Sequence, residues 1–151
     1  PKYQGITNAQ INKFELPENG GVIEIIAGEY ENIKGTAATF TPVYLLNTKL
    51  NKGAKASFNF PANYNTALLV IEGSVKVNDI KNISTDHFAL FENEGEEFTI
   101  EATENTVVLV LSGEPIEEPI VAHGPFVMNT QTEIMQAFSD MNIGKFGYLE
   151  D

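Results

Sequence analysis

The chain has 151 residues, of which 42% are hydrophobic, and this length and composition fit one folded domain and exclude a disordered segment. It contains no cysteine, which excludes disulfides, zinc–thiolate sites and cysteine nucleophiles. All nine basic residues are lysines, against 21 acidic residues, and the net charge of −12 predicts no direct contact with nucleic acid or with an anionic membrane.

Most of the chain is predicted to form short β-strands separated by turns. Apolar and polar residues alternate in these segments, which are rich in β-branched and aromatic residues. No helical period interrupts them, and this favours an all-β sandwich or barrel over a parallel βαβ sheet. The expected strands are residues 22–27, 43–50, 58–60, 67–72, 75–77, 88–91, 98–101 and 106–111.

The character of the chain changes near Gly113. Residues 112–125 contain three prolines, which cannot donate hydrogen bonds to a strand ladder. This stretch is therefore predicted to be an extended connector on the surface. We expect residues 1–112 to form the β fold, and residues 113–151, the connector with a C-terminal helix, to belong to the same domain.

A single helix is predicted after the connector, over residues 131–143. Thr130 and Glu133 match a T-x-x-E capping box, which satisfies backbone N–H groups at a helix start. Gly144 is suited to end the helix. One face of the helix is apolar, and it is expected to pack on the sheet of its own chain or, alternatively, on another domain or subunit. This face consists of Ile134, Ala137, Phe138 and Met141.

The stretch GAKASFNFPANYNTALLVIEG, residues 53–73, resembles the first motif of the cupin superfamily, a family of β-barrels. That motif places two histidines and a glutamate between two glycines, and these three side chains bind a metal. Here the histidine positions fall on Asn59 and Pro61, and the glutamate position falls on Asn65 or Thr66. Proline has no donor atom for a metal, and amide or hydroxyl oxygens are poor replacements for imidazole.

The second cupin motif, read without gaps over residues 88–102, offers Thr99 and Glu101 but no histidine. One carboxylate cannot hold a catalytic transition metal, which needs three or more converging donors. The two histidines, His87 and His123, share no ligand spacing, and no serine lies in a G-x-S-x-G elbow. The sequence therefore predicts a cupin scaffold without a metal site, and no catalytic residue or cofactor is assigned to this chain.

Four segments together resemble the C-terminal half of pirin-family proteins. They are PKYQ at 1–4, IAGEYENIKGTAATFTPVYLL at 26–46, GEPIEEPIVAHGPFVMNT at 113–130 and GKFG at 144–147. The resemblance implies a bicupin, two β-barrel domains face to face in a chain about twice as long. It also implies that an iron-type metal is held only by the N-terminal cupin. Some members have quercetin 2,3-dioxygenase-type activity, and mammalian pirin is a nuclear transcriptional co-regulator.

The stretch HGPFVMNTQTEI, residues 123–134, is interpreted as a segment that contacts another domain or subunit rather than as a catalytic loop. It places apolar residues in a segment that otherwise has the composition of a surface. We expect it, with the helix, to contact the N-terminal cupin domain of the same parent protein or a second copy in a homodimer. The contact residues are predicted to be Phe126, Val127, Met128, Ile134, Phe138 and Met141.

Two functions remain open at this point. The first is a metal-free C-terminal half of a pirin-like bicupin, with a structural, interdomain role. The alternative is a stand-alone cupin enzyme or small-ligand-binding module that uses the barrel lumen, where Tyr44, Phe58, Phe60 and Tyr64 would stack on a flat phenolic molecule. With no signal-peptide pattern and no apolar run near the roughly 18 residues of a membrane span, the expected location is the cytoplasm.

Overall fold

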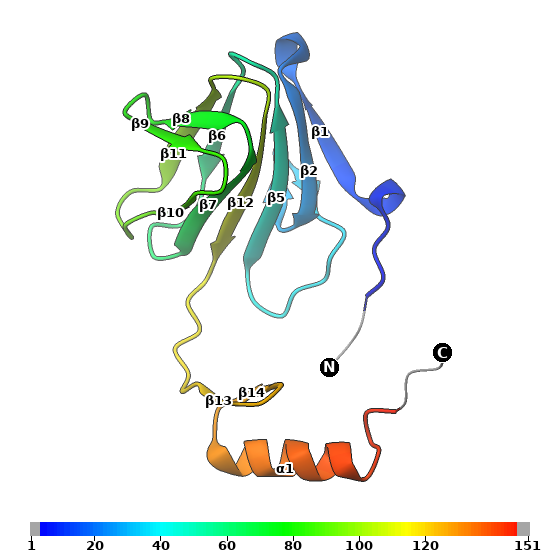
Figure 1. The fold of residues 1–151 in the computed structure, drawn as a ribbon. Helices are drawn as coiled ribbons and strands as arrows, with labels where there is room; N and C mark the ends of the chain where they lie inside the picture. Colours follow the sequence, from blue (N-terminus) through cyan, green and yellow to red (C-terminus); the bar gives the residue numbers. More distant parts are fainter. Residues whose placement is uncertain (1–3, 148–151) are drawn as a thin grey trace. The chain divides into compact units, whose positions relative to one another are not determined.

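The computed structural model describes residues 4–147 of the chain. It contains two compact units, which meet in the sequence between Pro115 and Ile116 (Figure 1). The first unit holds all the strands of the two large sheets, and the second holds a small hairpin and the C-terminal helix. That both units belong to one domain stays a prediction.

The first unit is built from two antiparallel sheets. The larger sheet has the order β1 (Asn12–Leu16), β2 (Gly21–Ala27), β5 (Val43–Leu50), β12 (Thr106–Gly113), β7 (Asn65–Glu72) and β10 (Phe88–Leu90). The smaller sheet has the order β6 (Lys55–Asn59), β11 (Glu97–Ala102), β8 (Ser74–Val77) and β9 (Lys81–Ser84). A short hairpin pairs β3 (Glu29–Tyr30) with β4 (Ile33–Lys34), and 3-10 turns cover Asn8–Gln10 and Pro17–Asn19.

The core of this unit lies between the two sheets, where alternate residues of each strand point inwards. In β12, for example, Thr106, Val108 and Val110 are buried while the residues between them are half-exposed. This period of two is the one read from the sequence. The largest fully buried side chains of the unit are Ile23, Ile25, Leu46, Thr48, Leu68, Val70, Val75, Ile100, Val108 and Val110.

The predicted all-β fold with one short C-terminal helix is confirmed, in the form of a sandwich of two sheets rather than a closed barrel. All eight predicted strands are present, with ends that differ by a few residues. The strands β1, β3, β4 and β9 were not predicted. They are two to five residues long and carry few apolar residues, so their alternation is weak.

The second unit consists of a hairpin, β13 (Val121–His123) and β14 (Phe126–Met128), and the helix α1 (Gln131–Asn142). The predicted capping box is confirmed, because Thr130 Oγ1 accepts from Glu133 N at 3.2 Å and Thr130 N donates to Glu133 Oε2 at 2.8 Å. Gly144 follows the helix in the left-handed conformation, with φ of +76°. Among residues 4–147, no helix has both the length and the apolar character needed to cross a membrane.

The prediction of an extended connector over residues 112–125 was wrong in part. Its first two residues extend β12, and Gly124-Pro125 turns the chain between β13 and β14. Proline is compatible with this hairpin because it lies in the turn, where no ladder hydrogen bond is needed.

Candidate functional site

A metal held inside this fold would need donor atoms on inward-facing side chains. In β6 the inward-facing residues are Ala56 and Phe58, whereas Ser57 and Asn59 are exposed. Just after the strand, Phe60 is buried, and Pro61 is exposed. The inward positions next to Asn59 on this segment, Phe58 and Phe60, therefore carry phenyl rings.

The sequence spacing placed the two histidine positions one residue further on, at Asn59 and Pro61. Asn59 points away from the core and its Nδ2 donates to Glu97 Oε1 at 3.1 Å. Because side chains alternate along a strand, a shift of one residue moves a position to the other face. The inward neighbours, Phe58 and Phe60, lack donor atoms altogether, so neither register supplies a metal ligand.

The other predicted metal-ligand positions do not converge on one point. Asn65 is exposed at the start of β7 and accepts a 3.4 Å hydrogen bond from Asn93 Nδ2. Thr99 and Glu101 lie on the outer face of β11. Only Thr66 faces the interior, where its hydroxyl is 2.8 Å from the buried Ser112 hydroxyl.

Near the C-terminal end of β6, a phenylalanine cluster packs between the two sheets. We define this cluster as Phe58, Phe60, Phe91 and Phe98. The ring of Phe98 lies at its centre, with ring centroids 4.5 Å from Phe91, 5.2 Å from Phe58 and 6.1 Å from Phe60. Tyr44 packs on this cluster, with its ring 4.8 Å from that of Phe60.

Beside the phenylalanine cluster is a hollow of about 80 Å³, lined by Phe60, Thr66 and Phe98 and by exposed loop residues that include Pro61 and Glu94. Sites for small organic ligands are usually several times larger, roughly 300–1,000 Å³. The four aromatic residues expected to stack on a phenolic ligand pack on one another, and two of them, Phe58 and Phe60, also line a larger hollow.

The inward-facing side chains do not fit a metal. Phenyl rings offer no lone pair, and the Thr66 hydroxyl is engaged by Ser112. Within the described residues, no group of three or more histidine, aspartate or glutamate side chains is placed to hold a metal ion. The exposed His87 has its Nδ1 2.9 Å from the Thr85 carbonyl oxygen. His123 lies in the second unit, where it packs against the ring of Phe138.

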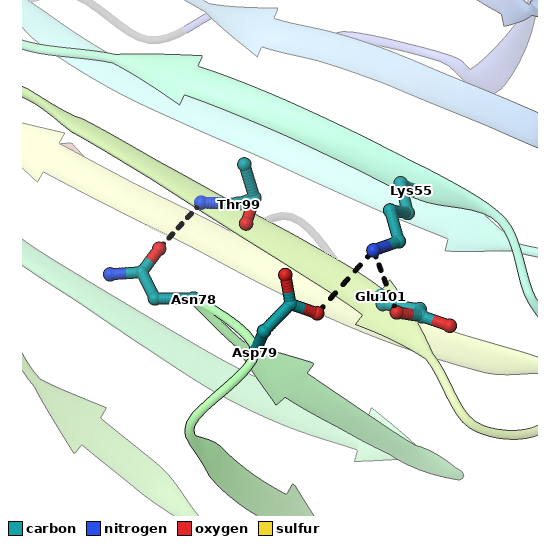
Figure 2. A network of polar contacts seen from close by, with 5 residues as sticks. All are labelled: Lys55, Asn78, Asp79, Thr99 and Glu101. Atoms are coloured by element: carbon teal, nitrogen blue, oxygen red, sulfur yellow. Dashed lines mark hydrogen bonds and ion pairs between the residues drawn. The ribbon is translucent and has the colours of Figure 1, made fainter.

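The outer face of the smaller sheet carries a network of polar contacts instead (Figure 2). Lys55 Nζ lies 3.0 Å from Glu101 Oε2 and 3.4 Å from Asp79 Oδ1, and these hydrogen bonds raise the pKa of Lys55. Asn78 Oδ1 accepts from the backbone N–H of Thr99 at 2.9 Å. The network fixes the turn between β8 and β9 against β11, and sequence spacing could not reveal it because the partners come from three separate segments.

Next to this network is a hollow of about 480 Å³, whose lining combines the rings of Tyr30, Phe58, Phe60 and Phe98 with polar residues that include Asn59 and Glu97. Its size and its mixed aromatic and polar lining are suitable for a small ligand. The Tyr30 hydroxyl donates to the Ser57 carbonyl oxygen at 3.2 Å, and burial, with a smaller contribution from Glu31, raises the pKa of Tyr30. Tyr30 thus stays protonated near neutral pH, and the hollow offers no poised acid–base pair.

The residues predicted to contact another domain or subunit all lie in the second unit. Phe126 contacts Phe138 and Phe146, with ring centroids 5.0 Å and 5.9 Å apart. Ile134 is buried inside the unit, so it is part of the unit's own small core rather than of its surface. Val127 is exposed and Met141 is partly exposed.

The exposed apolar side chains of this unit are more numerous than the sequence indicated. Sequence periodicity identified only the face of α1 that packs on the hairpin. The remaining large apolar residues at the surface lie outside that periodic face, and the structure was needed to show them. They are Ile116, Ile120, Met135, Ile143 and Phe146.

Residues 45–147 match the family model described as the Pirin C-terminal cupin domain. Pirin from Homo sapiens is 34% identical over 153 residues, covering 98% of this chain and 52% of that protein. A pirin-like protein from Solanum lycopersicum is 33% identical, with 98% of this chain and 51% of that protein covered. The chain therefore spans about half the length of the curated relatives it matches.

A solved structure, named as quercetin 2,3-dioxygenase from Acinetobacter baumannii, is 44% identical and superposes with a TM-score of 0.89. The match covers 99% of this chain and 52% of that chain. The predicted cupin resemblance is confirmed. The chain belongs to the pirin family, through its C-terminal cupin domain.

Proposed function

We propose that this chain is the metal-free C-terminal half of a pirin-like bicupin, with a structural and interdomain role. The observation that carries the proposal is the phenylalanine cluster. Phe58 and Phe98 occupy inward-facing positions of β6 and β11, with Phe60 and Phe91 packed beside them, and the only inward-facing oxygen among the predicted ligand positions belongs to Thr66. A catalytic metal would have neither charge compensation nor ligands there.

The second unit supports an interdomain role. A hairpin and one helix, which together bury Ile134 and Ala137, form too small a core for independent stability. Val127, Met135 and Phe146 remain more than half exposed, and a surface of this kind is typical of a contact site. We propose that it contacts the N-terminal cupin domain of a longer parent protein, or a second copy of this chain.

The quercetin 2,3-dioxygenase activity named for the Acinetobacter baumannii relative is proposed to reside in the other half of such a protein. We propose no direct contact with nucleic acid or membrane, because the net charge is −12. A cytoplasmic location is proposed as well, since a cysteine-free chain gains nothing from an oxidising compartment.

The alternative function, a stand-alone enzyme or binding module that uses the lumen, is less well supported. The hollow of about 80 Å³ beside the phenylalanine cluster cannot enclose a molecule of flavonol size. The larger hollow of about 480 Å³ is lined by Tyr30, Phe58 and Phe60 among others, but the rings of Phe58 and Phe60 are packed against Phe98 in the core, and Tyr44 and Tyr64 do not line it.

Oxygen uptake tests the proposal directly. The purified chain, incubated with ferrous iron or nickel and then with quercetin, should consume oxygen no faster than the free metal does. The Acinetobacter baumannii relative, assayed in parallel, is the positive control. Saturable oxygen consumption that requires the folded chain would assign the activity to this half and contradict the proposal.

A further inference from the structure

The hollow of about 480 Å³ belongs entirely to the first unit. Its lining comes from the β3–β4 hairpin, from β6 and β11, and from the turn that follows β8. Two of the lining residues, Asn78 and Thr99, are joined by the hydrogen bond that holds this turn on β11 (Figure 2). The hollow is therefore shaped by contacts between segments that lie far apart in the sequence, and its shape is set within this chain.

Aromatic rings form the apolar part of this lining. Phe58, Phe60 and Phe98 are buried, so each presents only a small part of its ring, which core packing holds in place. Tyr30 is more accessible, being half-buried, and its ring centroid lies 5.6 Å from that of Phe58. The hydrogen bond from its hydroxyl to the Ser57 carbonyl oxygen fixes the orientation of the ring. The hollow thus offers a preformed aromatic surface to a flat apolar group.

The charged part of the lining is acidic. Glu29, Glu31 and Glu97 line the hollow, and no lysine of residues 4–147 does. Within these described residues none of the three carboxylates takes part in an ion pair, although Lys34 lies opposite Glu29 in the hairpin. Glu97 accepts a hydrogen bond from Asn59, which is a neutral partner. The negative charge of the lining is therefore not offset within the hollow.

The neighbouring polar network does not offset this charge either. Its ammonium group, that of Lys55, is shared between Asp79 and Glu101, so the network itself carries more negative than positive charge. The net charge of −12 adds a field of the same sign over the whole surface. A phenolate or carboxylate ligand is repelled by such a site, whereas a cation is attracted both by the carboxylates and by the faces of aromatic rings.

We propose that this hollow is a binding site for a small organic cation, an ammonium group carried on a flat apolar body. The carboxylates recognise the ammonium group, and the rings of Tyr30 and its buried neighbours recognise the apolar body. A neutral ligand of the same shape leaves the carboxylates without a partner. The site needs no metal and no catalytic group, so it goes beyond the structural role proposed above and does not depend on it.

Tryptamine, tryptophol and indoleacetate test the proposal, because they carry the same indole ring with a cationic, a neutral and an anionic side chain. The chain contains no tryptophan, so the fluorescence anisotropy of each probe can be followed with excitation that tyrosine does not absorb. Tryptamine should bind saturably at one site per chain, about tenfold or more tightly than tryptophol, and indoleacetate should bind more weakly than both. Equal affinities for tryptamine and tryptophol, or no saturable binding of tryptamine, would overturn the proposal.

A variant that carries Glu29→Gln, Glu31→Gln and Glu97→Gln locates the cation. It should weaken tryptamine binding about tenfold or more and leave tryptophol binding unchanged. The matched control removes the same charge at three exposed positions that do not line the hollow, and it should change the affinity less than about twofold at physiological ionic strength. Equal losses in the two variants would mean that tryptamine responds only to net charge, which would refute the site. The control substitutions are Glu15→Gln, Glu18→Gln and Glu72→Gln.

Two substitutions of Tyr30 test the aromatic surface. Tyr30→Phe keeps the ring and should keep most of the affinity for tryptamine, whereas Tyr30→Leu should lower it several-fold. The urea unfolding midpoint of each variant shows whether the fold is retained, and the glutamate variants decide the proposal if Tyr30→Leu does not fold. Full affinity in a folded Tyr30→Leu variant would place the probe away from the ring and overturn the site. None of these failures touches the proposed structural role, which oxygen uptake tests separately.

Discussion

Replacing Phe98 with alanine is expected to lower the free energy of unfolding by about 3–5 kcal/mol. The side chain is 6% exposed, and its ring touches three others of the phenylalanine cluster. Removing it deletes buried apolar surface and leaves a cavity between two rigid sheets that cannot close around it. Urea denaturation followed by circular dichroism measures the change.

Two further variants make this result interpretable. Phe98→Leu keeps most of the buried volume and should cost about 1–2 kcal/mol, so it stays measurable even if the alanine variant does not fold. Phe88→Ala removes the same side chain from an exposed position and should cost less than about 1 kcal/mol. If Phe98→Ala were as mild as Phe88→Ala, the lumen would be open and the cluster would not be a packed core.

Replacing Glu24 with glutamine is expected to cost about 2–3 kcal/mol at neutral pH. Glu24 is only 5% exposed, on the outer side of β2. Its carboxylate lies 3.0 Å from the ammonium groups of Lys13 and Lys49 and accepts from Asn47 Nδ2 at 2.8 Å. Burial raises the pKa of Glu24, but these hydrogen bonds and the charge of Lys49 outweigh it and lower the pKa from 4.5 to about 2.

The lowered pKa gives the stability of the chain a defined dependence on pH. The folded state binds this proton more weakly than the unfolded state does, so the contribution of Glu24 is complete above about pH 4.5. As the pH falls from there towards about 2, up to about 3 kcal/mol is lost. Denaturant titrations at several pH values should show this loss in the parent chain, and the Glu24→Gln variant should lack that part of it.

Glu101→Gln is the matched control for Glu24. Glu101 also pairs with a lysine at 3.0 Å, but both side chains are substantially exposed, and such pairs contribute about 0–1 kcal/mol. The control should therefore change neither the neutral-pH stability nor its pH dependence by much. Equal effects of the two substitutions would mean that Glu24 is solvated and that its ion pairs add little.

The fold was predictable because its long strands alternate strongly. The segment Val43–Leu50 matches the predicted strand at both ends, and the capping box at Thr130 and Glu133 located the helix start. Both signals are local, since each depends on residues a few positions apart. The hairpin β13–β14 escaped prediction because the three prolines of residues 112–125 suggested an irregular connector, although only Pro125 lies in the hairpin, and it lies in the turn.

The candidate site was harder to predict, because it depends on which way side chains point. The motif spacing found the right strand but selected Asn59 instead of the inward-facing Phe58 and Phe60. A fixed spacing carries no information about the face of a strand when the following loop changes length.

The metal content of the purified chain tests the central claim most directly. The chain is incubated with excess iron, nickel, copper or manganese and then separated from unbound metal. Its metal content is measured by elemental mass spectrometry. Phenyl rings at the inward-facing positions predict a content far below one equivalent of any of these metals. One tightly held equivalent, lost when the chain is unfolded, would contradict the account and make this half a metal-binding cupin in its own right.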